Sequence, residues 1–237
     1  MTQAPSSHWI ELVIQIEYGL DTNLIDIGSK DYKHFPLISL EQKYRQHHNY
    51  GRIMAALIDL KLTFQFLTHD FSYACGVFNE QLHVKVLEGR TEKEILSSKI
   101  LFLKYLNMFI LRCRSFWDKA MGIMVLVLNS DNYDVFLQAN SRRKTFKKVM
   151  HNHLTEETII NMDALIKVLD NKFRTAEAHQ TGTLRTWIFK KWDSNPMNTP
   201  FGDLLGIYNL TFEYAEQISK LLENISIVPN ITNTTEY

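Results

Sequence analysis

The stretch from Thr91 to Leu128 constrains the fold more than any other part of this chain. Thr91 can cap a helix, Glu92 and Glu94 place negative charge in its first turn, and apolar residues then recur at helical spacing up to Leu128. The polar residues 129–132 mark its end. The pattern predicts a helix of about nine turns. A helix of this length with an apolar face favours a helical bundle.

Three further stretches favour helices. Apolar residues fall mostly at helical spacings over residues 40–67 and predict a long buried helix. Thr155 can cap another helix, which Gly182 can stop. Thr199 followed by Pro200 is a typical start for a last helix. The chain is therefore predicted to be mainly α, with four to five long helices in a bundle.

The remaining segments lack this pattern. Apolar and polar residues alternate over residues 10–18, which predicts a half-buried strand, and turn-forming residues follow it. Residues 71–91 fit either a helix or a strand. We expect a short N-terminal extended or β appendage over residues 1–40, a helical bundle over residues 41–224 and a flexible C-terminal tail over residues 225–237.

The composition argues against several classes of protein. The 26 basic and 26 acidic residues cancel, so the chain lacks the overall positive field of non-specific nucleic-acid binders, and any RNA site has to be local. Cys75 and Cys113 lie far apart and without metal-ligand spacing, which argues against a disulfide framework and a structural zinc. The longest apolar run, residues 121–128, is too short to span a membrane. We expect a cytoplasmic protein with no metal, no cofactor and no membrane partner.

Arg174 and His179 are the candidate catalytic residues. Both lie near the predicted end of the helix that begins at Thr155. An arginine can stabilise the charge that builds on an attacked phosphate, and a histidine with a pKa of about 6.5 can move protons near neutral pH. The alternative is that both are solvated cations at a helix end, where positive charge complements the helix dipole.

The segment Phe173-Arg174-Thr175-Ala176-Glu177-Ala178-His179 resembles the motif of the HEPN superfamily, in which four residues separate an arginine from a histidine late in a helical bundle. It looks most like the branch whose motif reads Phe-Arg-polar-x-x-Ala-His. The chain has Thr175 where that branch commonly has asparagine. Asp118, within residues 115–119, looks like part of the polar patch that such bundles place opposite the motif; otherwise it is a structural partner of a nearby arginine or lysine.

The resemblance implies a metal-independent endoribonuclease that acts at a homodimer cleft, as in bacterial toxin–antitoxin and phage-defence systems. It implies that His179 is the general acid and base, that Arg174 holds the phosphate oxygens, and that Thr175 and Asp118 support them. RNA, a second copy of the chain and an antitoxin or other defence-system protein are the partners it implies.

Two basic segments are candidate RNA-binding surfaces. The denser one contains Arg142, Arg143, Lys147 and Lys148, which could contact the RNA backbone or simply form a solvated connector. The other contains Arg185 and Lys190 together with Trp187 and Phe189, whose rings could stack on unpaired bases or belong to the core.

Two other functions remain open from the sequence. One is a HEPN-like module without catalytic activity that binds RNA or a protein. The other is an unrelated helical interaction protein in which the Arg174 and His179 spacing is accidental. Cleavage that is lost in His179→Ala while binding is retained would separate the enzyme from the binding module.

Overall fold

The fold is known from a computed structural model, which describes residues 34–82, 87–175, 182–190, 192 and 199–225. The described residues form eight α-helices and no strand. The helices are α3 (Leu37–Tyr44), α4 (Tyr50–Val77), α6 (Glu92–Leu128), α7 (Tyr133–Leu137), α8 (Arg142–Met150), α9 (Glu156–Val168), α11 (Thr183–Lys190) and α12 (Pro200–Asn224). Two π-helical turns, η3 (Phe78–Leu82) and η5 (Leu169–Arg174), extend α4 and α9, and a 3-10 turn, η4 (Ser130–Asn132), follows α6. The prediction of a mainly α bundle is confirmed.

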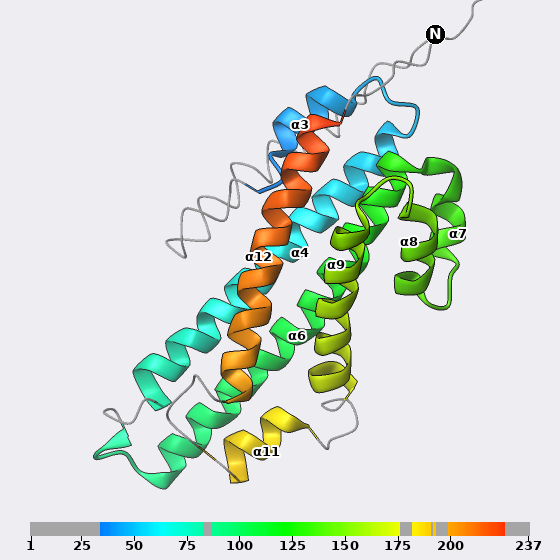
Figure 1. The fold of residues 1–237 in the computed structure, drawn as a ribbon. Helices are drawn as coiled ribbons and strands as arrows, with labels where there is room; N and C mark the ends of the chain where they lie inside the picture. Colours follow the sequence, from blue (N-terminus) through cyan, green and yellow to red (C-terminus); the bar gives the residue numbers. More distant parts are fainter. Residues whose placement is uncertain (1–33, 83–86, 176–181, 191, 193–198, 226–237) are drawn as a thin grey trace, which may run out of the picture.

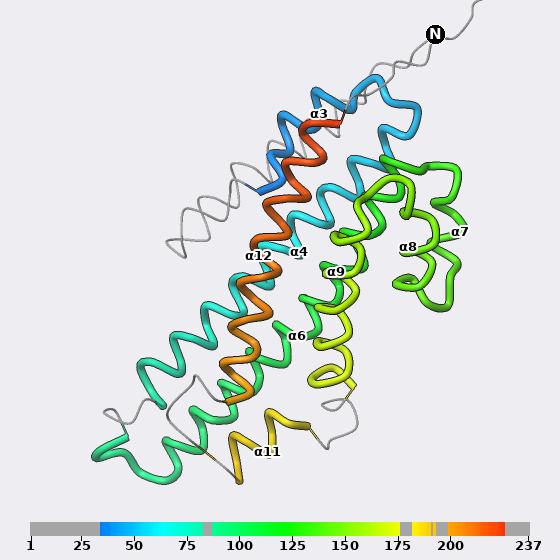
Figure 2. The backbone as a smooth tube through the Cα atoms, viewed as in Figure 1, coloured from blue at the N-terminus to red at the C-terminus, as the bar shows by residue number. Residues whose placement is uncertain are grey.

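Helices α4 and α6 form the long axis of the bundle and lie side by side (Figure 1). Helix α12 packs across both of them. The Tyr208 ring of α12 stacks on Phe71 of α4 with 4.5 Å between centroids, and the Thr211 hydroxyl lies 3.6 Å from the Cys113 sulfur of α6. Helix α9 contacts α8, and its extension η5 packs on α6, while α7 and α8 form a small subassembly at one end of α6 (Figure 2).

Aromatic side chains fill the core between α4, α6 and α12. The Phe64 ring of α4 lies 5.4 Å from Phe116 of α6 and 5.8 Å from Phe212 of α12. Phe116 and Trp117 are fully buried. Such rings remove much apolar surface from water, and their tilted contacts fix how three helices meet. This core holds the middle of α6 rigid, and the candidate site is attached there.

Local cap chemistry explains where the predicted helices begin. The Thr91 hydroxyl accepts a hydrogen bond from the Glu94 N–H at 3.3 Å, and the Glu94 carboxylate accepts one from the Thr91 N–H at 2.8 Å. Thr155 likewise accepts from the Thr158 N–H. Pro200 is the first residue of α12, as predicted, although the Thr199 side chain makes no capping bond. The three predicted helix starts are confirmed.

The single long helix predicted from Leu40 is wrong, because α3 and α4 are separate helices. Helix α3 already begins at Leu37, inside the segment expected to form turns. The residues between the two helices, 45–49, are all polar and supply nothing to bury. Helix α3 is instead held against the end of α12, where the Tyr44 hydroxyl donates to the Leu222 carbonyl at 2.8 Å.

The ambiguous residues 71–91 are helical up to Leu82, because α4 runs on to Val77 and η3 continues to Leu82, whereas residues 88–91 form a turn and the N-terminal cap of α6. The strand predicted over residues 10–18 and nearly all of the predicted C-terminal tail lie outside the described residues.

Candidate functional site

Arg174 is the last residue of the π-helical turn η5, at the end of the helix that was predicted to carry the motif. The preceding residue, Phe173, is fully buried and anchors this turn in the core. The Arg174 side chain is half exposed, at 50%. Its guanidinium contacts the Asp170 carboxylate at 3.4 Å, which is long for a charge-assisted hydrogen bond. The positive charge of Arg174 is therefore available at the surface.

Asp170 is held more tightly by a second arginine. The Nε of Arg114, on α6, lies 3.0 and 3.2 Å from the two Asp170 carboxylate oxygens. Another nitrogen of Arg114 lies 2.5 Å from Asp118, one turn further along α6. Asp118, Arg114, Asp170 and Arg174 thus form a continuous chain of ion pairs, which we call the charge chain.

Arg114 is the centre of the charge chain. Its side chain is only 13% exposed, so its two contacts are screened less by water than the outer one at Arg174. Arg114 already neutralises the Asp170 carboxylate, so the longer contact with Arg174 adds little to the stability of that carboxylate. The arrangement leaves the Arg174 guanidinium with one long contact to Asp170 and half of the side chain exposed.

The other predicted members of the site occupy different places. Asp118 contacts Arg114. It is separated from Arg174 by Arg114 and Asp170 in the charge chain. The Thr175 side chain is exposed, and its backbone N–H bonds to the Asp170 carbonyl. His179 lies outside the described residues.

Arg114 and Asp170 were not predicted from the sequence as members of the site. Both belong to pairs four residues apart on a helix, Arg114 with Asp118 and Asp170 with Arg174, which is the spacing of neighbouring side chains on one helical face. Those two pairs could have been found from the sequence. The bond that joins them links residues 56 positions apart and depends on how η5 packs on α6.

The predicted RNA-binding residues of α8 separate into different environments. Arg143 and Lys147 both contact Asp163 of α9, at 3.0 and 3.2 Å. Burial raises the pKa of Asp163, but hydrogen bonds from Lys167 and Lys147 and the charge of Arg143 outweigh it and lower that pKa.

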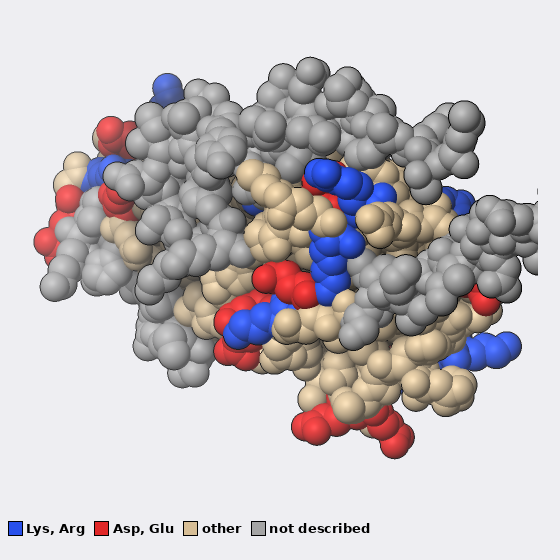
Figure 3. Space-filling model, turned by 90° about the horizontal axis from the view of Figure 1, so that it is seen from above, with Lys and Arg blue, Asp and Glu red and all other residues tan. Residues whose placement is uncertain are grey.

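Lys148 is exposed on the surface, whereas Arg142 lines a pocket. On the face seen in Figure 3, described basic side chains lie beside acidic ones and form no broad positive surface. The basic surface offered by α8 is therefore smaller than its sequence suggests.

The second predicted RNA-binding segment forms α11. Arg185 and Lys190 are exposed on it. Trp187 is buried and stacks on Trp192, with 5.2 Å between the ring centroids, so it belongs to the core. Phe189 is 40% exposed. This helix offers two cations and one accessible aromatic ring.

A pocket of about 440 Å³ lies between α4, α6, α7 and α8. Asp118 of the charge chain lines it, as do Lys119 and Arg142. The described residues include no cluster of three or more His, Cys, Asp or Glu side chains that could hold a metal ion. In the same part of the chain, no helix is both long and apolar enough to cross a membrane. No family model, curated protein or solved structure matches this chain.

Proposed function

We propose that this protein is a metal-independent endoribonuclease in which Arg174 binds the scissile phosphate and His179 transfers protons. The observation that carries the proposal is the half-exposed, weakly paired guanidinium of Arg174, held at a helix end by a charge chain whose other members satisfy one another. A half-exposed guanidinium whose one contact is long can form two parallel hydrogen bonds to phosphate oxygens.

The proposed reaction needs two histidines, one from each copy of the chain. One His179 removes the proton from a ribose 2′-hydroxyl, and the 2′-oxygen attacks the phosphorus. The bond from phosphorus to the 5′-oxygen breaks, and the second protomer's His179 donates a proton to that oxygen. Arg174 stabilises the negative charge on the non-bridging oxygens. The products are a 2′,3′-cyclic phosphate and a 5′-hydroxyl end.

An exposed leucine beside the charge chain offers a position at which the proposed homodimer can be tested. Leu111 is 62% exposed and lies three residues before Arg114 and seven before Asp118, on the same face of α6. Single exposed apolar side chains are common on protein surfaces, so Leu111 does not by itself require a partner, but an interface at this position can be tested. Such an interface would bring the two charge chains toward each other across a two-fold axis.

The test uses purified protein and cellular RNA in excess EDTA. The parent protein should produce fragments with cyclic-phosphate ends. His179→Ala should lose about 10²–10⁴-fold in rate because it removes the acid and base, and Arg174→Ala about 10²–10³-fold because it removes charge stabilisation. Lys220→Ala is the matched control, since Lys220 is a surface cation, 67% exposed, on α12.

The dimer is tested separately by Leu111→Glu. This variant should sediment as a monomer and lose cleavage while keeping its helical content. Cleavage by His179→Ala at the parent rate, or by a monomeric Leu111→Glu protein, would disprove this mechanism. RNA binding without cleavage by the parent would identify a binding module instead. The setting we propose, a toxin–antitoxin or phage-defence system, is tested by expressing the parent and His179→Ala in bacteria and comparing growth.

A further inference from the structure

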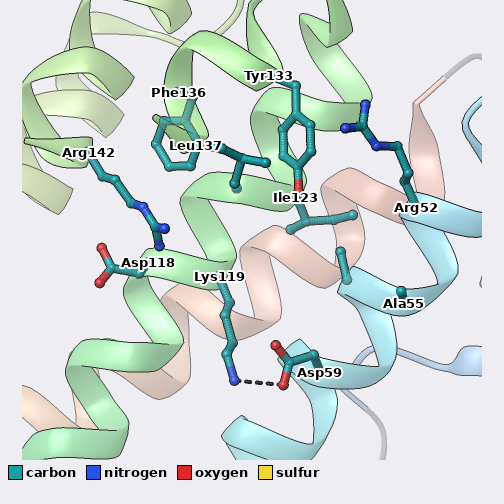
Figure 4. A pocket seen from close by; sticks show the side chains of 12 residues that line it. Arg52, Ala55, Asp59, Asp118, Lys119, Ile123, Tyr133, Phe136, Leu137 and Arg142 are labelled. Carbon is teal, nitrogen blue, oxygen red and sulfur yellow. Dashed lines mark hydrogen bonds and ion pairs between the residues drawn. The ribbon is translucent and has the colours of Figure 1, made fainter. Parts of the chain in front are cut away.

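We propose that the pocket between α4, α6, α7 and α8 binds a small aromatic monocarboxylate. Its volume, about 440 Å³, lies within the range of pockets that enclose small organic ligands. Figure 4 shows how its walls are arranged. Arg142 and Asp118 lie at one end and Arg52 at the other, with Tyr133, Phe136 and Leu137 along one side and the Lys119 and Asp59 pair along the opposite side.

The charges of the lining leave one cation without a carboxylate. Three cations and two carboxylates line the pocket, an excess of one positive charge. Asp59 is bonded to Lys119 at 2.7 Å, and Asp118 to Arg114 at 2.5 Å. Arg52 and Arg142 are the remaining two cations of the lining.

Arg52 is bonded to Asp134, which lies outside the pocket, at 2.9 Å. Arg142 acts electrostatically on the Tyr133 hydroxyl but forms no ion pair or hydrogen bond with the residues that the structure describes. It is nevertheless partly buried at the pocket wall. A guanidinium in that position is stabilised by an anion that accepts its two parallel donors. Because the excess charge is one, a monoanionic carboxylate fits the pocket better than a dianionic phosphate.

The rest of the lining favours a ligand whose carboxylate is attached to a flat, apolar group. Phe136 is fully buried and Ile123 lies beneath the pocket. Gly122 contributes no side chain, and a Cβ placed there would already lie 3.6 Å from the Phe136 ring. The Phe136 ring therefore packs directly over α6 at Gly122 and closes this wall of the pocket with apolar surface. Tyr133 adds a second aromatic ring, and the Arg52 guanidinium lies over it, 5.2 Å from the ring centroid. Aromatic rings pack well on one another in tilted or offset contacts.

The test measures binding of phenylacetate and indole-3-acetate to the full chain by titration calorimetry. Their neutral amides serve as matched ligands without the charge. We expect the carboxylates to bind and the amides to bind at least tenfold more weakly, because a charge-assisted hydrogen bond is lost. Arg142→Gln should weaken the carboxylates by about tenfold to a hundredfold. Lys144→Gln, an exposed cation on the same helix, should leave binding unchanged.

Four outcomes would overturn the proposal. The proposal is wrong if neither carboxylate binds at millimolar concentration. Equal affinity for the acids and the amides would show that Arg142 does not bind the carboxylate. Tighter binding of adenosine monophosphate or inorganic phosphate, lost in Arg142→Gln, would assign the pocket to phosphates. Loss of carboxylate binding in Arg174→Ala but not in Arg142→Gln would place the ligand at the proposed cleavage site. These measurements do not depend on RNA cleavage, so either proposal can fail alone.

Discussion

Replacing Gly122 by alanine should stabilise this protein. Gly122 lies inside α6, where glycine costs about 1 kcal/mol relative to alanine because its backbone loses more freedom on folding. The new Cβ would lie 3.6 Å from the Phe136 Cε1, which is an ordinary van der Waals contact, so no neighbour has to move. We expect the free energy of unfolding to rise by about 1 kcal/mol and Tm by about 2–4 °C.

The assay is thermal unfolding followed by circular dichroism, with urea unfolding at fixed temperature as the second measurement. Gly206→Ala is the matched control. Gly206 is exposed within α12, and no atom lies within 4 Å of a Cβ placed there, so it reports helix propensity alone. Both variants should gain stability. A lower Tm for Gly122→Ala beside a higher Tm for Gly206→Ala would refute the packing of α7 on α6 described above.

Three further variants test the cap, the buried acid and the charge chain. Thr91→Ala removes the two hydrogen bonds of the Thr91 hydroxyl, which accepts from the Glu94 N–H and donates to the Glu94 carboxylate, while the backbone N–H of residue 91 can still donate to that carboxylate. The free energy of unfolding should fall by about 1 kcal/mol in urea, and no change would contradict the capping box. Burial raises the pKa of Asp70 from 3.8 to about 6 despite its ion pair with Arg112. The folded protein therefore holds this proton more tightly than the unfolded chain, and stability should fall by about 2–3 kcal/mol as pH rises from about 4 to about 6. Asp70→Asn should flatten that fall, and an identical fall in the variant would assign it to other groups. Arg114→Ala should destabilise the fold by about 2 kcal/mol or more, because it leaves two partly buried carboxylates without their shared cation; a loss below about 0.5 kcal/mol, typical of a surface ion pair, would show that the charge chain is not structural.

The candidate site was only partly predictable. Arg174 was found because the residue types around it resemble a known motif. Its neighbour Asp170 was missed, although the two are four residues apart, because a carboxylate at that spacing is common on any helix. The structure adds that Arg114 holds Asp170 and leaves Arg174 half exposed. The availability of the Arg174 charge depends on that contact between α6 and η5.

The basic residues of α8 illustrate the same limit. Arg142, Arg143 and Lys147 are equivalent as a run of charges in the sequence. In the fold, Asp163 of α9 neutralises two of them, while Arg142 turns to the pocket. Neighbouring residues on a helix point in directions about 100° apart, so which charge meets which helix is set by packing.

The sequence by itself determined the mainly α fold and the starts of α6, α9 and α12. Those features depend on residues within about one helical turn of each other, so the information is local. Only the tertiary structure decided the separation of α3 from α4, the charge chain and the pocket. Each of these depends on contacts between residues far apart in the chain, such as Tyr44 with Leu222 and Arg114 with Asp170. Burial of the apolar helix faces brings those residues together. Many sequences with the same helical pattern could bury such faces with different polar contacts, so the pattern does not predict which contacts form.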